Sequence, residues 1–164
     1  MNGITEYPLA LQLLMQTDGT VTELIELLTK EKLSVIKVSS DIEDKDNAQV
    51  LQRRIYLQGM QSQTYWLFAH SVIFLDNLPK EFVSDLIDKT IPIGTLWNDY
   101  RIETFKQVIS KQAELSKSIE ISGFKQGEEL LSRTYEVYSQ NKIIMQITEK
   151  FPIQSYESLN LLIS

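Results

Sequence analysis

The stretch LSRTYEVYSQNKIIMQITEKFP, residues 131–152, decides the fold class of this chain. Its two halves are rich in β-branched and aromatic residues and are separated near Gln140-Asn141. Two such runs with a turn between them predict a pair of antiparallel strands. The C-terminal part of the sequence therefore favours a β-hairpin.

In the second run, alternation of side chains places one acidic residue on an apolar face. Glu149 shares that face with Met145, Ile147 and Phe151. A carboxylate in apolar surroundings is costly to bury unless it is paired or protonated. Glu149 is therefore a candidate functional residue.

Other segments supply more strands. A further hairpin is expected from residues 48–59 and 64–75, which are separated by GMQSQ. Residues 33–38 form a short β-type run, and the polar residues 39–47 read as a loop. Residues 101–110 alternate imperfectly, so a strand competes with a helix there. The total is about six strands with a few short helices. Hairpins without βαβ units indicate an α+β fold with an antiparallel sheet.

Two short helices are expected between these strands. Thr20 and Glu23 match a capping box, which predicts a helix over residues 20–29. A proline and early acidic residues predict a second helix over residues 80–88. Residues 91–100 hold a proline and a glycine in close succession, so they form a loop or the start of a short helix.

Composition excludes several classes of function. A length of 164 residues indicates one domain, residues 1–164, that can bury a core without disulfides. A net charge of −6 argues against nucleic-acid binding, which needs a basic surface. With no cysteine and a single histidine, His70, a Cys/His metal site is not expected. The absence of a long apolar run or a basic signal-peptide region predicts a cytoplasmic protein without a membrane span.

Arginine remains as a candidate ligand-binding residue, because its planar fork grips a carboxylate with two hydrogen bonds. Each arginine of the chain lies in or beside an expected strand: Arg53, Arg54, Arg101 and Arg133. Arg53 shares the more apolar face of its strand, with Leu51 and Ile55, and is expected to point inward. It either binds a ligand or pairs structurally with Glu149 across the sheet, and the structural pairing is the commoner situation for a strand arginine.

Four stretches form an ordered set along most of the chain: TDGTVTELIELL, RRIYL followed by YWLFAHSVIFLDNLP, PIGTLWNDYRIET, and SRTYEVYSQNKIIMQITEKFP. This set resembles the chorismate lyase family, and it is most similar to the archaeal, cyanobacterial and plastid branch. The resemblance implies a six-stranded antiparallel sheet whose helices and flap loops enclose an internal ligand cavity. It also implies conversion of chorismate to 4-hydroxybenzoate and pyruvate without a metal or organic cofactor. The protein would be a monomer or a weak homo-oligomer, and its product a precursor of quinone head groups.

Site residues carry over from the family one position at a time. The family's strand arginine corresponds to Arg53, with Arg54 as the alternative register. The glycine and arginine of its W-L-x-G-R pattern fall on Ala69 and His70, a departure that removes one arginine used by the bacterial enzymes. The remaining matches are the P-L-G loop at Pro92, Ile93 and Gly94, the acid-bearing strand at Thr148, Glu149, Phe151 and Pro152, and the branch's own Arg101 and Arg133.

These matches imply a division of roles. Arg53 would bind one carboxylate of chorismate, and Arg101, Arg133 or His70 would bind the other. Glu149, kept protonated by its apolar surroundings, would protonate the departing ether oxygen or hydrogen-bond the ring hydroxyl. The segments around Asp18-Gly19 and Pro92-Gly94 would form the roof of the cavity.

A second function remains open from the sequence. The same fold occurs in effector-sensing domains of transcription regulators, which bind small acids without converting them. This chain would then be a non-catalytic module that binds a small aromatic or carboxylic acid. Such regulators have an attached DNA-binding domain, and no basic N-terminal domain is evident here, which favours the enzyme.

Overall fold

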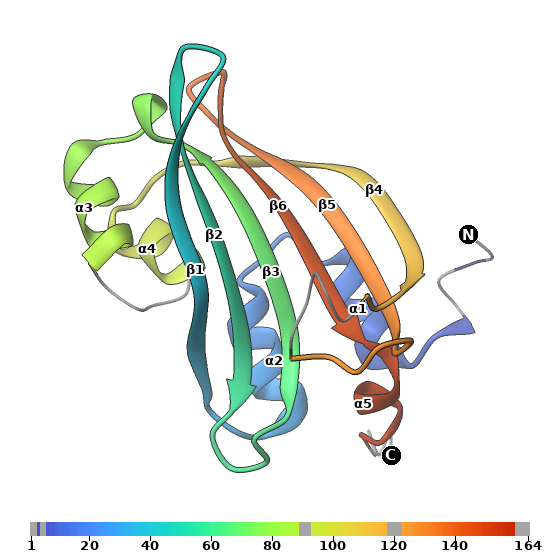
Figure 1. Cartoon of the computed structure of the whole chain (residues 1–164). Helices are drawn as coiled ribbons and strands as arrows, with labels where there is room; N and C mark the ends of the chain where they lie inside the picture. Colours follow the sequence, from blue (N-terminus) through green and yellow to red (C-terminus); the bar gives the residue numbers. More distant parts are fainter. Residues whose placement is uncertain (1–2, 4–5, 89–92, 118–122, 160–164) are drawn as a thin grey trace.

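A six-stranded antiparallel sheet forms the centre of the computed structural model (Figure 1). The structure describes all residues except 1–2, 4–5, 89–92, 118–122 and 160–164. The strands are β1 (Leu33–Lys45), β2 (Ala48–Gly59), β3 (Tyr65–Phe74), β4 (Phe105–Leu115), β5 (Glu129–Ser139) and β6 (Lys142–Pro152). Their order is β1-β2-β3-β6-β5-β4, so two three-stranded meanders join through β3 and β6 and leave β1 and β4 at the edges.

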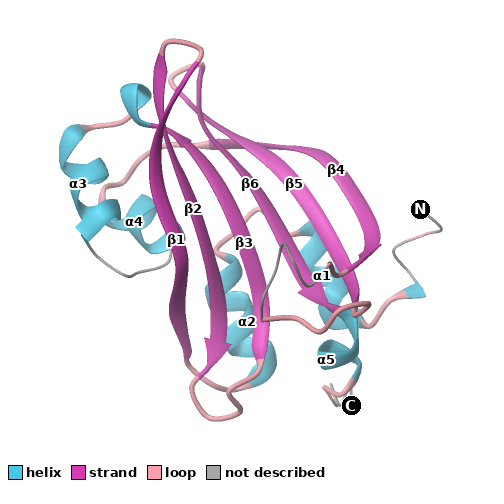
Figure 2. Cartoon of the chain, in the orientation of Figure 1, coloured by secondary structure: helices cyan, strands magenta, loops and turns pink. Residues whose placement is uncertain are grey.

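The helices pack on one face of this sheet, as Figure 2 shows. They are α1 (Leu9–Gln16), α2 (Val21–Thr29), α3 (Lys80–Asp88), α4 (Ile93–Asp99) and α5 (Ile153–Glu157), with a 3-10 turn, η2, at Leu75–Asn77. None of the helices in the described ranges is long and apolar enough to cross a membrane.

Two hydrophobic clusters occupy the helix-covered face. One packs α1, α2 and α5 against one half of the sheet, where it includes Leu57, Leu67 and Phe151. The other packs α3 and α4 against the opposite half, where it includes Ile73 and Met145. Most inward residues have odd numbers on β2, β3, β5 and β6, as strand alternation requires, and the exceptions Trp66 and Ile144 lie at register shifts. A seam between the two clusters therefore crosses the middle of the sheet.

Most predicted elements are confirmed. Both hairpins form, β2 with β3 and β5 with β6, and the helices predicted over residues 20–29 and 80–88 are α2 and α3. The segment 91–100 contains α4, with residues 91–92 outside the described part of the chain. Helix α1 was not expected.

One prediction needs correction, and one open alternative is decided. Residues 39–45 are not a loop, because β1 continues to Lys45 and pairs with β2 as far as Ala48, and only Asp46 and Asn47 form the turn. Backbone hydrogen bonds to a neighbouring strand stabilise this extension although its side chains are polar. The ambiguous segment 101–110 is not a helix in its second half, where β4 begins. A register shift between Val108 and Ser110 explains why its alternation is imperfect.

Candidate active site

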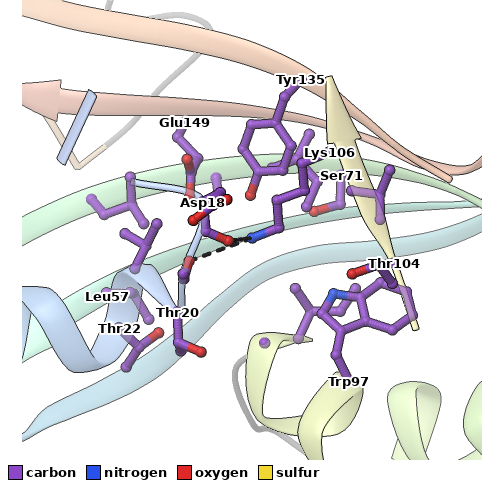
Figure 3. A pocket seen from close by; sticks show the side chains of 18 of the residues that line it. Asp18, Thr20, Thr22, Leu57, Ser71, Trp97, Thr104, Lys106, Tyr135 and Glu149 are labelled. Carbon is purple, nitrogen blue, oxygen red and sulfur yellow. Dashed lines mark hydrogen bonds between the residues drawn. The ribbon is translucent and has the colours of Figure 1, made fainter. Parts of the chain in front are cut away.

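A cavity of about 190 Å³ lies at the seam between the two hydrophobic clusters (Figure 3). This volume is below the roughly 300–1,000 Å³ of pockets for drug-sized ligands, so it suits a single small ring. Residues 18–20 of the α1–α2 linker line it, as do Ile93 and Gly94 of α4. The two segments touch, since a Cβ atom on Gly94 would lie 3.2 Å from Thr20 Cγ2. The expected roof is confirmed for these residues, whereas Pro92 lies outside the described chain.

Glu149 lines the cavity from β6 and is almost completely buried. Its cross-strand neighbour on β5 is Arg133, whose Nε donates a hydrogen bond to Glu149 Oε1 at 2.7 Å. The arginine side chain is also buried. The two residues thus form a buried ion pair with a charge-assisted hydrogen bond. The cross-strand pairing expected for Glu149 is therefore present, but its partner is Arg133 instead of Arg53.

Tyr135 extends this network along β5, two residues after Arg133. Its hydroxyl is close enough to Glu149 to feel the charge of that carboxylate, and its ring lies 5.2 Å from the Arg133 guanidinium carbon. Burial, together with the nearby charge of Glu149, raises the pKa of Tyr135 well above its ordinary value. The phenol therefore stays protonated at neutral pH and acts as a hydrogen-bond donor within the cavity.

Arg53 lines the cavity from β2, as alternation predicted, and its side chain is buried. Its neighbour across the β2–β3 pair is Ser71, and Ile55 lies opposite Ala69. Both Ala69 and Ser71 line the cavity. Burial lowers the pKa of Arg53, but an arginine remains charged at neutral pH. The β2–β3 side of the cavity thus presents a cation and a hydroxyl.

Arg133, an expected ligand-binding residue, does not itself line the cavity, and two further expected ligand-binding residues lie elsewhere. His70 sits between inward Ala69 and Ser71, so its side chain points to the opposite face of the sheet. There its Nε2 hydrogen-bonds Gln52 Oε1 at 2.6 Å, and burial and the nearby Arg54 lower its pKa. Arg101 is exposed just after α4. The expectation that either residue lines the cavity is wrong.

Sequence reasoning did not single out Lys106, a cavity residue on the edge strand β4. Its Nζ donates to the backbone carbonyls of Asp18 at 2.9 Å and Gly19 at 3.4 Å (Figure 3). Burial lowers the pKa of Lys106, while the charges of Glu149 and Asp18 oppose that shift. Alternation did place Lys106 on one face with Thr104, and both residues line the cavity.

In the described part of the chain, the cavity therefore combines two cations, the carboxylates of Asp18 and Glu149, and several hydroxyl groups with apolar side chains. Such a set can bind an organic acid and move a proton at a defined position. No group of three or more His, Asp or Glu side chains that could hold a metal ion occurs among the residues that the structure describes.

Comparison with known proteins identifies the family of the chain. The family model described as chorismate pyruvate-lyase Rv2949c-like matches residues 15–159. The chain belongs to this family. A chorismate pyruvate-lyase of Mycobacterium tuberculosis (strain H37Rv) is 27% identical over 156 residues, which cover 86% of this chain and 78% of the relative. The enzyme of the same name from Mycobacterium leprae is 31% identical over 107 residues, covering 59% and 51%.

Solved structures share the fold of this lyase family member. PhnF from Mycobacterium smegmatis superposes with a TM-score of 0.65 at 14% identity, over 84% of this chain and 65% of PhnF. The effector domain of PhnF gives a TM-score of 0.63 at 14% identity, over 82% of this chain and 88% of the domain. The expected chorismate lyase-like fold is confirmed, and this chain spans about two thirds of full-length PhnF.

Proposed function

We propose that this single-domain protein eliminates pyruvate from chorismate and releases 4-hydroxybenzoate. Membership in the Rv2949c-like chorismate pyruvate-lyase family supports a lyase. The main structural support is that Arg53 and Glu149, the latter paired with the buried Arg133, line one cavity of single-ring size. A buried carboxylate that faces a ligand cavity together with cations suits a reaction of an organic acid.

The proposed reaction breaks two bonds on the chorismate ring. The C3–O bond to the enolpyruvyl group and the C4–H bond are lost, and the C4 hydroxyl stays on the ring. The ring becomes aromatic, while the enolpyruvate leaves and tautomerises to pyruvate. Because aromatisation makes the elimination favourable, correct positioning and exclusion of water supply a large part of the catalysis.

Each cavity residue has a proposed role. Arg53 binds the ring carboxylate through a charge-assisted hydrogen bond. Glu149, which accepts a hydrogen bond from Arg133, takes the C4 proton or accepts a hydrogen bond from the C4 hydroxyl. Tyr135, protonated because burial raises its pKa, donates to the departing ether oxygen. Ala69, Ile93 and Gly94 shape the pocket around the ring.

Incubation of the purified protein with chorismate tests this proposal. The products are separated by chromatography, and we expect 4-hydroxybenzoate and pyruvate in equal amounts. Isochorismate in a parallel reaction tests the choice of substrate, and a sample without protein measures spontaneous breakdown. Tight binding of 4-hydroxybenzoate without any conversion of chorismate would instead support a non-catalytic binding module.

A further inference from the structure

We propose that Lys106 is the second carboxylate-binding residue of the site, so that the cavity selects a dicarboxylate over a monocarboxylate. The inference rests on the proposed function for the identity of the substrate. What it predicts is that the cavity binds a dicarboxylate more tightly than a matched monocarboxylate. It assigns a ligand-binding role to a lysine that the sequence motifs did not mark.

Two cations line the cavity within the described part of the chain, Arg53 and Lys106. They come from β2 and β4, which are separated in the sheet by β3, β6 and β5. With neighbouring strands about 4.8 Å apart, the two backbones would be about 19 Å apart in a flat sheet. The two long side chains thus reach into one cavity from different sides. A ligand with carboxylates at two ends matches this arrangement.

The other cations near the cavity have different roles. Arg133 binds Glu149 through Nε and the Thr17 carbonyl through Nη1, the latter at 2.8 Å. His70 faces the opposite side of the sheet, and Arg101 is exposed. Lys106 therefore supplies the positive charge that was expected from Arg101, Arg133 or His70.

Lys106 can accept a ligand without leaving its present position. An ammonium group has three N–H donors, and Lys106 uses two for the carbonyls of Asp18 and Gly19. These bonds hold Nζ at the roof of the cavity, with the Tyr135 ring 5.4 Å away. A lysine fixed in advance loses little further freedom when a carboxylate binds to it.

The order of side chains across the sheet matches the proposed substrate. Arg53 lies on β2, Glu149 on β6, Tyr135 on β5 and Lys106 on β4. If the ring carboxylate lies at Arg53, the para hydroxyl at C4 points toward Glu149. The ether oxygen on C3 is then near Tyr135, and its carboxylate extends toward Lys106. After elimination the second carboxylate leaves with pyruvate. The product 4-hydroxybenzoate therefore has only the ring carboxylate, which binds Arg53.

Two stable acids separate this role from a purely structural one. The probe 3-(carboxymethoxy)benzoate carries a ring carboxylate and an ether carboxylate in the meta arrangement of chorismate, and it cannot undergo elimination. The matched probe 3-methoxybenzoate lacks the second carboxylate. Affinities of both are measured by isothermal titration calorimetry for the wild type, Lys106→Met and Lys106→Arg. Lys111→Met is the control, because it also removes a positive charge from β4. Lys111 is not among the described residues that line the cavity.

We expect the wild type to bind the diacid more tightly than the monoacid. Lys106→Met should weaken diacid binding by roughly 10–100-fold, as for loss of a charged hydrogen bond, and monoacid binding by less than about threefold, within the scatter of such contacts. Lys106→Arg should restore part of the preference, and Lys111→Met should leave it unchanged. Equal losses for both probes in Lys106→Met would show that the lysine only holds the roof and would overturn the proposal.

A wild type without preference for the diacid would also overturn it, whether or not Lys106→Met folds. Neither measurement needs turnover. A diacid preference that depends on Lys106, in a protein that leaves chorismate unchanged, would therefore refute the proposed function and leave this inference standing.

Discussion

Glu149→Gln is the most informative single change at the site. The substitution keeps the shape of the side chain and a carbonyl oxygen that can accept the Arg133 Nε hydrogen bond, now 2.7 Å long. It removes the negative charge beside a buried guanidinium and the only carboxylate assigned a role in proton transfer. Stability and turnover should therefore both change, for separate reasons.

The expected magnitudes follow from the burial of the pair. Removing one partner of a buried ion pair costs about 3–5 kcal/mol, and the retained acceptor places Glu149→Gln near the lower end. A loss of about 3 kcal/mol corresponds to a fall in melting temperature of about 6–12 °C for a chain of this size. Loss of a positioned acid or base lowers the rate by about 10²–10⁴-fold. Binding of 4-hydroxybenzoate should weaken by less than about tenfold, which is 1.4 kcal/mol, because Arg53 is intact.

Three measurements on one preparation test this prediction: thermal melting, chorismate turnover well below the melting temperature, and calorimetry with 4-hydroxybenzoate. Glu114→Gln is the matched control. Glu114 also forms a 2.7 Å ion pair, with Lys150, but both side chains are partly exposed and neither lines the cavity within the described residues. The control should lose less than about 1 kcal/mol and retain its turnover. A Glu149→Gln protein with normal turnover would refute the catalytic assignment, and an unchanged melting temperature would refute the stabilising role of the pair.

Three further predictions concern separate parts of the molecule. Arg53→Met should weaken binding of 4-hydroxybenzoate by roughly 10–100-fold in calorimetry, and an unchanged affinity would place the ligand elsewhere. Glu31 accepts hydrogen bonds from the backbone of Gln61 and Ser62 and from the Ser62 and Trp66 side chains. Burial raises the pKa of Glu31, but these bonds together outweigh burial and lower it. Its stabilisation is thus present above the unfolded pKa and is lost as pH falls through the lowered folded pKa. In urea unfolding at neutral pH, Glu31→Ala should lower the free energy of unfolding by about 2–3 kcal/mol relative to the wild type. The difference between the two proteins should be smaller below about pH 4. A difference that does not change with pH would contradict this prediction. Burial raises the pKa of Tyr156 well above its ordinary value. Above about pH 10 the unfolded chain loses this proton while the folded chain keeps it, so stability should fall with rising pH. Tyr156→Phe removes the 2.6 Å hydrogen bond to the Trp66 carbonyl and should lower the free energy of unfolding by about 1 kcal/mol at neutral pH. Its free energy of unfolding should then decrease less steeply than that of the wild type as pH rises. An equally steep decrease would show that other groups cause the effect.

Alternation in the sequence predicted the strands that cover a hydrophobic cluster. Met145, Ile147 and Phe151 all pack against helices, so the inward face of β6 was evident from residue types alone. The outer part of β1 was missed because its side chains are solvated on both faces. Its extended form depends on backbone bonds to β2, and side-chain composition does not reveal such bonds.

Some site residues could be found from the sequence, and others could not. Arg53 and Glu149 were found because a charged residue on an apolar strand face is unusual. Lys106 was passed over because a lysine on an edge strand is usually solvated, and only the fold brings β4 beneath residues 17–20. His70 was placed wrongly by matching it to a motif next to Ala69. Adjacent strand residues point to opposite faces, so Ala69 and His70 could not both line the cavity.

A structure of the protein with bound 4-hydroxybenzoate would show whether Arg53 and Glu149 hold one ligand at its two ends. We expect the ligand in the cavity beneath residues 18–20, with its carboxylate on Arg53 and its hydroxyl within hydrogen-bond distance of Glu149. A ligand on the other face of the sheet near His70, or one with its carboxylate turned away from Arg53, would contradict this expectation.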